Sequence, residues 1–406
     1  MNILVINKFL FPRAGDVISA LNTARLLAEH GHQVTLWGMA HERNPGYEYQ
    51  ELFATFIDFN VRDSFFNNIG KACNVIYSLS ARKKLDELLK RVRPDVAHLH
   101  SFHHHLSPSI LHTLRQHRVP LVATLHDFKM VCPAYTLFSN NRPCELCGFG
   151  NYYNCFLHKC VKNSYSKSLV NVVETYLHKK VFHSYDSIKV FISPSRFLME
   201  KCRQMGFSAD IVHIANFVYQ EAAVSDKPIN KGCIAYVGRL SREKGLLTLL
   251  DAVKGVTGVF LKIIGDGPQR RELESKVGKE NIGNVKFFGH CDSLTLKKEL
   301  AECAFTVLPS LWYENCPNSV LESFSLGKPV VGADIGGIPE LIEQEETGLL
   351  FQSGNAADLR EKIIYLIGRE ALVEKMRQEI LRRVGKDYGP EKHYEKLMQL
   401  YAKILS

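Results

Sequence analysis

The sequence lacks any apolar run near the ~18 residues of a membrane-spanning helix, so it predicts no transmembrane segment. Its first stretch, MNILVINKFLFP, has no basic segment before the apolar residues and soon reaches Pro12, which predicts a first strand and not a secretory signal. Low-complexity tracts and short-period repeats are also missing. The 406 residues, 46% hydrophobic and 23% charged, predict a cytoplasmic globular protein of two domains.

Negative charge is scarce in the first half of the chain. Residues 1–215 hold 25 Lys and Arg against 16 Asp and Glu, a net charge of +9, whereas residues 216–406 hold 26 of each. Fifteen of the 17 histidines also lie in the first half. Such a bias predicts an anionic partner, for which nucleic acid, anionic lipid and a pyrophosphate-bearing substrate all qualify. A charge that only serves solubility is the alternative.

Short apolar runs alternate with helical patterns along the whole chain, which is typical of βαβ order and parallel sheets. We therefore predict an α/β fold of two doubly wound Rossmann-like domains facing a cleft, with ligands at the carboxyl ends of the strands. The boundaries are 1–218 for the first domain, 219–389 for the second, with a polar connector over 219–232, and 390–406 for a C-terminal amphipathic helix. The predicted strands are 2–7, 32–38, 96–100, 119–126, 189–195, 233–240, 259–267, 285–290, 305–310 and 329–334.

The segment WYENCPNSVLESF predicts an anion site at a helix start. Pro317 suits the first helical position, which would leave the N–H groups of Asn318, Ser319 and Val320 free to bind an anion. Glu314 precedes this helix and Glu322 lies inside it, where both carboxylates can accept hydrogen bonds from hydroxyl groups beside a phosphate. An ordinary helix with two solvated glutamates is the alternative.

Two cations follow a predicted strand in YVGRLSREKG. Arg239 comes directly after the strand and Lys244 precedes Gly245, a placement that fits a ligand with two negative charges. Each alone is more often a surface charge. The nearby IGDGP has only two of the three glycines of a dinucleotide fingerprint, so a tight turn is the better interpretation there.

These motifs, together with LGKPVV and GGIPELI…TGLLF, resemble the second domain of retaining glycosyltransferases of family 4, the group-1 glycosyl transferases. The resemblance covers essentially the whole chain and implies the GT-B architecture, with a hexosyltransferase-type transfer from a nucleotide-diphosphate sugar. It implies that Arg239 and Lys244 hold the donor diphosphate, that Glu322 binds the ribose, and that Glu314 contacts the transferred sugar. Backbone N–H groups of residues 315–320 would assist, and His290 would lie near the base.

The first half also resembles that family. NKFLFPRAGDVIS is similar to its glycine-rich loop, which implies that this loop approaches the donor phosphate. Ala14 stands where the first of two glycines is usual, and Gly15 still allows the turn. TLHDFKMVCP implies that His126 touches the donor sugar and that Asp127 lies next to the acceptor. The acceptors implied are glycans or lipid-linked pyrophosphates of bacterial surface polysaccharide synthesis. No Asp-x-Asp motif stands where a GT-A enzyme needs one, so we expect no catalytic metal; fixed cations would neutralise the leaving diphosphate.

Five of the 11 cysteines lie between Cys132 and Cys160. The thiols of Cys144, Cys147, Cys155 and Cys160 have knuckle-like spacing, which predicts a structural zinc in a reducing compartment. Cys132 and His158 are spare ligands. Buried or free thiols are the alternative, and similar Cys-rich insertions occur in bacterial members of the family.

Three other interpretations depend on the same residues. A nucleotide-sugar epimerase of the same architecture would need an acid pair in the cleft and no acceptor surface. A nucleic-acid-binding protein would need aromatic and basic residues interleaved on an exposed sheet, whereas the predicted strands are buried. The segment 65–93 combines an apolar stripe with a basic end, which predicts peripheral contact with the anionic inner face of a membrane; an ordinary core-facing helix is the alternative.

Overall fold

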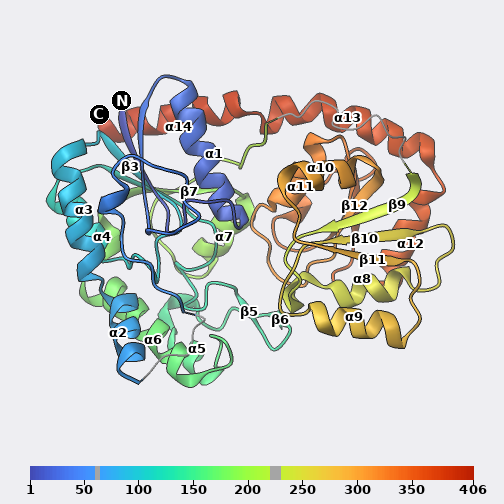
Figure 1. Cartoon of the computed structure of the whole chain (residues 1–406), viewed down its shortest axis with the longest axis horizontal. Helices are drawn as coiled ribbons and strands as arrows, with labels where there is room; N and C mark the ends of the chain where they lie inside the picture. The colour runs from blue at the N-terminus through green and yellow to red at the C-terminus, as the bar shows by residue number, and fades with distance from the viewer. Residues whose placement is uncertain (60–64, 220–229) are drawn as a thin grey trace. The chain divides into compact units, whose positions relative to one another are not determined.

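The structure is a computed structural model that describes residues 1–59, 65–219 and 230–406 of the chain (Figure 1). The chain divides into two compact units. Unit 1 comprises residues 1–137, 145–214 and 394–406, and unit 2 comprises residues 138–144 and 215–393. Most of the connector expected at 219–232 lies outside the described residues. The short stretch 138–144, which we expected in the first domain, groups with unit 2.

A six-stranded parallel sheet forms the centre of unit 1, in the order β2-β1-β3-β4-β7-β8. Its inner strands are almost wholly buried, which explains why they read as continuous apolar runs instead of alternating ones. Strands β1 and β2 pair in parallel, with Asn2 opposite Gln33 and Ile6 opposite Trp37. The strands are β1 (Asn2–Ile6), β2 (Gln33–Trp37), β3 (Val96–Leu99), β4 (Leu121–Thr124), β7 (Ile188–Ser193) and β8 (Ile211–His213).

Helices cover the sheet of unit 1, and the last helix of the chain packs on it. Leu397, Leu400 and Tyr401 share one core with Ile3 and Val5 of β1. The Tyr401 hydroxyl also hydrogen-bonds His98 of β3 (2.7 Å). The helices are α1 (Gly15–Glu29), α2 (Phe65–Ile76), α3 (Leu79–Val92), α4 (Ile110–Gln116), α5 (Tyr153–Leu157), α6 (Tyr165–Tyr176), α7 (Arg196–Gln204) and α14 (Pro390–Leu405).

Unit 2 has its own parallel sheet, in the order β11-β10-β9-β12-β13-β14. Renumbered from β9, this is the 3-2-1-4-5-6 order of dinucleotide-binding folds, and the order reverses between β9 and β12. Ligands of such sheets bind at the carboxyl ends of the strands on either side of that reversal. The elements are β9 (Asn230–Val237), β10 (Phe260–Ile264), β11 (Val285–Gly289), β12 (Cys303–Leu308), β13 (Val330–Ala333), β14 (Gly348–Phe351), α8 (Leu246–Val253), α9 (Arg270–Lys279), α10 (Ser293–Ala301), α11 (Asn318–Ser325), α12 (Ala356–Ile367) and α13 (Glu370–Tyr388). The stretch 138–144 contains a two-stranded antiparallel hairpin, β5 (Phe138–Ser139) with β6 (Arg142–Pro143).

The apolar stripe expected at a membrane surface over 65–93 is wrong for α3. Leu85, Leu88 and Leu89 of this helix are buried in the core of unit 1. Its basic end is partly neutralised, because Lys90 pairs with Asp86 (2.7 Å) and Arg91 pairs with Glu51 (3.1 Å). The spacing of apolar residues identified an amphipathic helix correctly but could not decide between a membrane and the core; the structure confirms the alternative of a core-facing helix, and α3 packs against α4.

Candidate active site

The sequence motifs of unit 2 follow β9 and β12, the two strands where the order of its sheet reverses. Arg239 and Lys244 come after β9, and Glu314 comes after β12. Because all strands of the sheet are parallel, their carboxyl ends lie at one edge. The fold therefore carries the predicted cations and the first glutamate to the same edge of one sheet.

Lys244 and Glu314 form an ion pair at this edge. The Lys244 Nζ lies 2.6 Å from the Glu314 Oε1, and the hydroxyl of Ser310 donates to the same oxygen (2.7 Å). The lysine Nζ also lies 5.1 Å from the centre of the Trp312 ring. Burial alone would raise the pKa of the Glu314 carboxyl, but the Lys244 ammonium and the Ser310 hydroxyl hold it below its usual range. The carboxylate is therefore ionised and fixed in position at neutral pH.

The glycine pair after β13 holds the Glu314 loop. Gly337 donates its N–H to the Glu314 carbonyl (2.8 Å). Gly336 has φ +65°, and a Cβ there would lie 2.6 Å from both the backbone nitrogen and oxygen of Glu314. Only a residue without a side chain allows this approach. The turn at Gly336 and Gly337, which follows α11 in the sequence, thus holds the backbone of Glu314, which precedes α11.

Helix α11 begins at Asn318 with Pro317 as its N-cap, one residue later than predicted. The prediction of three free N–H groups is wrong for Val320, whose N–H donates to the Pro317 carbonyl (3.0 Å). The Asn318 side chain accepts a hydrogen bond from Asn216 (3.0 Å). The N–H of Ser319, among the described residues, has no backbone partner, so it remains available to an anion.

Glu322 lies half-buried one turn into α11. Burial raises the pKa of its carboxyl to about 7, against the opposing effect of Lys297. A carboxyl group with this pKa changes its charge near neutral pH, where the ionised form accepts hydrogen bonds from hydroxyl groups better than the neutral form does.

We expect the pH to change donor affinity through Glu322. UDP-glucose is a suitable probe because its pyrophosphate diester does not titrate near neutrality, and its affinity should rise as the pH passes upward through about 7. The gain between the two protonation states should be roughly 10- to 100-fold, the value of one hydrogen bond to a charged group. Calorimetry from pH 5.5 to 8.5 measures it. In Glu322→Gln the profile should be flat, and an unchanged profile in this variant would contradict the assignment.

The same raised pKa predicts a stability effect in the absence of nucleotide. The folded pKa exceeds the ordinary value of 4.5, so the folded protein binds more protons than the unfolded chain between about pH 4.5 and 7. The contribution of Glu322 to stability therefore falls as the pH rises through this window. Thermal unfolding of Glu322→Gln should lack this component.

Arg239 and His290 are both exposed at the ends of their strands. Within the described ranges no carboxylate pairs with the Arg239 guanidinium, in contrast to the paired Lys244. His290 follows β11, the edge strand, two positions from β9 in the sheet. Both residues lie at the carboxyl ends of their strands, as predicted. Neither contacts the Lys244–Glu314 pair in any interaction described by the structure.

In unit 1, His126 follows β4 and joins a row of three imidazoles. Its Nε2 lies 2.9 Å from the Nδ1 of His100, and the His100 ring stacks on His98 with ring centres 4.4 Å apart. Burial lowers the pKa of His126 to about 4, against the opposing effect of the Asp16 carboxylate. His126 is therefore a neutral imidazole at neutral pH, able to donate one hydrogen bond and accept another.

Three residues near His126 were not predicted from the sequence. Asp16, in the first turn of α1, interacts electrostatically with Lys8 and His126 and hydrogen-bonds Ser101. Burial alone would raise the pKa of Asp16, but Lys8 and His126 hold it below the usual range. Lys8 and Ser101 follow β1 and β3, neighbours at the reversal point of this sheet, so strand order was the one signal that would have pointed to them.

Gly15 is exposed and is the first residue of α1, with Ala14 as N-cap. The expectation that this glycine permits a special turn is not supported, because its backbone is helical and many residues can adopt that conformation. Asp16 in the next position is the better candidate for a functional residue of this loop, because it interacts with Lys8, His126 and Ser101.

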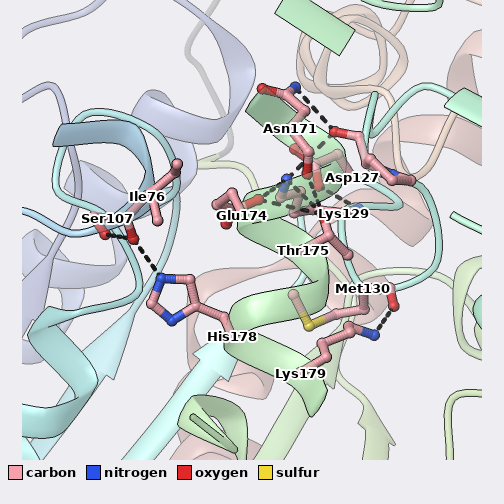
Figure 2. A network of polar contacts seen from close by, with 11 residues as sticks. Ile76, Ser107, Asp127, Lys129, Met130, Asn171, Glu174, Thr175, His178 and Lys179 are labelled. Atoms are coloured by element: carbon pink, nitrogen blue, oxygen red, sulfur yellow. Dashed lines mark hydrogen bonds and ion pairs between the residues drawn. The ribbon is translucent and has the colours of Figure 1, made fainter. Parts of the chain in front are cut away.

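A buried polar network holds the segment that follows His126 (Figure 2). Asp127 accepts a hydrogen bond from the Lys129 backbone N–H (2.9 Å), and burial raises the pKa of its carboxyl. The Lys129 Nζ is bound by Glu174 Oε2 (2.6 Å), the Pro133 carbonyl (3.3 Å) and Thr175 Oγ1 (3.4 Å). Helix α6 thus anchors the loop that carries the predicted acceptor-side carboxylate.

Four of the cysteines of 132–160 interact in two pairs. Cys132, named only as a spare, hydrogen-bonds Cys147, and Cys155 hydrogen-bonds Cys160. The partner thiol and then burial raise the pKa of Cys147 and Cys155. Cys144 belongs to unit 2, unlike the other three predicted ligands. In the part of the chain that the structure describes, no three His, Cys, Asp or Glu side chains are arranged to hold a metal ion. The predicted quartet is therefore not assembled as ligands, and zinc content stays a prediction.

Two family models match the chain along most of its length. Residues 15–221 match the model described as Glycosyltransferase Family 4, and residues 220–383 match Glycosyl transferases group 1. The Rhizobium meliloti lipopolysaccharide core biosynthesis glycosyltransferase LpsE is 29% identical over 43% of this chain, and the match spans 53% of LpsE, about half its length. N-acetyl-alpha-D-glucosaminyl L-malate synthase of Bacillus anthracis is 22% identical over 96% of this chain and 94% of its own length.

Solved structures show the same fold over the whole chain. Sucrose-phosphate synthase from Thermosynechococcus elongatus is similar with a TM-score of 0.72, at 18% identity over 99% of this chain and 98% of that one. Anabaena HepE, in complex with UDP-glucose, has a TM-score of 0.67 at 16% identity over 99% and 100% of the two chains. The two parallel sheets, the motifs at their carboxyl ends and the match over residues 15–221 together show that this chain belongs to glycosyltransferase family 4.

Proposed function

We propose that the chain is a retaining glycosyltransferase that moves a sugar from a nucleotide-diphosphate sugar to a glycan or lipid-linked acceptor of bacterial surface polysaccharide. The observation that carries this proposal is the Lys244–Glu314 pair at the reversal point of unit 2. It offers a cation to a diphosphate and a fixed, ionised carboxylate to sugar hydroxyls within one loop cluster. The name of LpsE refers to lipopolysaccharide core biosynthesis, and HepE was solved in complex with UDP-glucose; both agree with this class of acceptor and donor.

The proposed roles of the side chains follow from their charge and burial. Arg239 and Lys244 neutralise the diphosphate, and the N–H of Ser319 assists. Glu322 accepts hydrogen bonds from the ribose, Glu314 binds hydroxyls of the transferred sugar, and His290 lies near the base. In unit 1, His126 is the neutral imidazole for the donor sugar and Asp127 faces the acceptor.

The proposed transfer keeps the anomeric configuration because the acceptor attacks from the same face of the sugar that the diphosphate leaves. The bond between the anomeric carbon and the diphosphate oxygen breaks while the bond to the acceptor oxygen forms. The proton of the acceptor hydroxyl passes to the leaving diphosphate, whose charge Arg239 and Lys244 stabilise. No helix in the described parts of the chain is long and apolar enough to cross a membrane. The excess of basic residues in the first half of the chain supports peripheral contact with the anionic inner face of a membrane when the acceptor is lipid-linked.

A panel of nucleotide sugars tests the proposal. We expect one of them to raise the unfolding temperature, and the same donor to yield a product only when an extract of lipid-linked or glycan acceptors is added. NMR of the product should show the anomeric configuration of the donor. An inverted product would contradict the retaining mechanism. Conversion of the donor sugar without any acceptor would support the epimerase alternative instead.

A further inference from the structure

Two neighbouring helices of unit 1 expose apolar side chains at helical spacing. Tyr153 and Leu157 lie four residues apart on α5, and Phe149 lies in the turn before this helix; their exposed fractions are 51%, 57% and 79%. Tyr165, Leu169 and Val173 form an equally spaced row on α6. The two helices pack side by side at one end of unit 1, next to α2 (Figure 1). We call these six residues the insertion patch.

The polarity of α6 is inverted relative to an ordinary surface helix. An amphipathic helix normally turns its apolar row to the core and its polar row to water. Helix α6 instead buries mainly polar residues and exposes Leu169 and Val173; the buried residues are Ser168, Asn171, Val172, Glu174 and Thr175, of which Glu174 and Thr175 bind Lys129. Core packing therefore does not explain the exposed row. Exposed apolar side chains gathered on neighbouring helices of a folded domain mark an interaction site.

The segment that carries the insertion patch is predominantly basic, and its nearest exposed carboxylates in the sequence, Glu145 and Asp186, lie just outside it. Residues 146–185 contain five lysines and a single carboxylate, Glu174, which is buried and paired with Lys129. Lys162, Lys167 and Lys180 are exposed. The Nζ of Lys159 lies 4.4 Å from the centre of the Tyr165 ring, so positive charge directly adjoins the apolar row. No exposed Asp or Glu offsets it within residues 146–185.

We propose that the insertion patch is the surface through which the protein binds an anionic lipid bilayer. Lipid headgroups take up the lysine charge, and the acyl boundary takes up leucine, valine and the aromatic rings, as in interfacial helices. Nucleic acid would use the lysines but not Leu157, Leu169 or Val173. A second copy of the chain would bring like charges together. This proposal rests on the proposed function only in that the acceptor is lipid-linked.

Sedimentation with two kinds of vesicle tests the surface. Wild-type protein should bind vesicles of phosphatidylcholine with 30% phosphatidylglycerol, should release at high salt, and should not bind phosphatidylcholine alone. Lys159→Gln, Lys162→Gln and Lys167→Gln together should weaken binding roughly 100-fold, at about fivefold for each basic residue near the surface. Phe149→Ser, Leu157→Ser and Leu169→Ser together should weaken it to a similar extent. All six side chains are at the surface or partly exposed, so these variants should fold.

A matched charge control comes from α3, the segment first expected at the membrane. Lys83→Gln, Lys90→Gln and Arg91→Gln remove the same charge from the same unit and should change the vesicle affinity less than threefold. Phe149→Trp should show blue-shifted fluorescence that brominated lipids quench. Equal loss in the α3 control, absence of quenching, or wild-type binding by the patch variants would each overturn the proposal. A wild-type dimer that the serine variant converts to a monomer would also overturn it, because the surface would then be an interface between copies.

The nucleotide experiments read the proposed function separately. The thermal response to nucleotide sugars is measured without vesicles, and neither patch variant should change it. Vesicle binding without any nucleotide response would leave the insertion patch standing and remove the transferase proposal. A nucleotide response with no vesicle binding would overturn the insertion-patch proposal and leave the transferase proposal standing.

Discussion

Lys129→Met is expected to lower the free energy of unfolding of unit 1 by about 3–5 kcal/mol, the usual cost of breaking a buried ion pair by removing one partner. Lys129 and Glu174 are both buried, and their charged atoms lie 2.6 Å apart. In the variant, the Glu174 carboxylate would keep only its contact with the Thr175 hydroxyl (3.2 Å) among the described interactions. Denaturant unfolding of the variant and the wild type measures the difference.

A double variant separates the lost pair from lost packing. Adding Glu174→Gln to Lys129→Met removes the isolated charge and should recover more than half of the lost stability. Lys90→Met is the exposed control, since its pair with Asp86 is at the surface and should contribute less than about 1 kcal/mol. If Lys129→Met unfolds within 1 kcal/mol of wild type, the buried pair does not anchor the Asp127 loop as argued.

Lys244→Met is expected to weaken the binding of nucleoside diphosphate by roughly 10- to 100-fold, since one charge-assisted contact is lost. We expect the loss of affinity to lie near 100-fold, because the buried Glu314 carboxylate would then face the diphosphate without the Lys244 ammonium beside it. Stability should also become sensitive to pH. Without Lys244, burial leaves the pKa of Glu314 above its usual value of 4.5, so the stability of the variant falls as the pH rises above about 4.5.

Two further variants separate these effects. Lys244→Met with Glu314→Gln should regain the stability at pH 8 but not the nucleotide affinity. Arg239→Met is the matched control at the same edge, because the Arg239 side chain is exposed; it should lose affinity while its free energy of unfolding changes by less than about 0.5 kcal/mol. Calorimetry gives the affinities, and denaturant unfolding at pH 5 and 8 gives the stabilities. Unchanged nucleotide affinity in both Lys244→Met and Arg239→Met would contradict the diphosphate role.

The location of the proposed lipid-binding surface shows what a periodic pattern leaves open. Helix α3 and helix α6 both have apolar residues at helical spacing, and the sequence favoured the segment of α3 for membrane contact because of its basic end. The structure buries the apolar row of α3 and exposes that of α6. The difference arises because α6 uses its polar row to surround the Lys129 ammonium inside unit 1. A pattern within one helix does not contain that partner.

The sequence by itself determined the features that depend on neighbours along the chain. Buried strands followed by helices, the glycines at tight turns and the cations directly after β9 are local signals, so the two doubly wound sheets and the residues at the edge of unit 2 could be predicted. The family resemblance added roles for Glu314 and Glu322 that local pattern alone left open.

Only the tertiary structure decided which distant groups meet. It brought Lys244 to Glu314 over 70 positions, Lys129 to Glu174 over 45, and His98 to Tyr401 over 303. It paired Cys132 with Cys147, and it turned the Val320 N–H toward Pro317. Such contacts depend on strand order and on which face of a helix the sheet covers, and both are set by packing of the whole unit. Local periodicity states that a face is apolar or polar, but the free energy of burial against a specific neighbour decides which face is hidden.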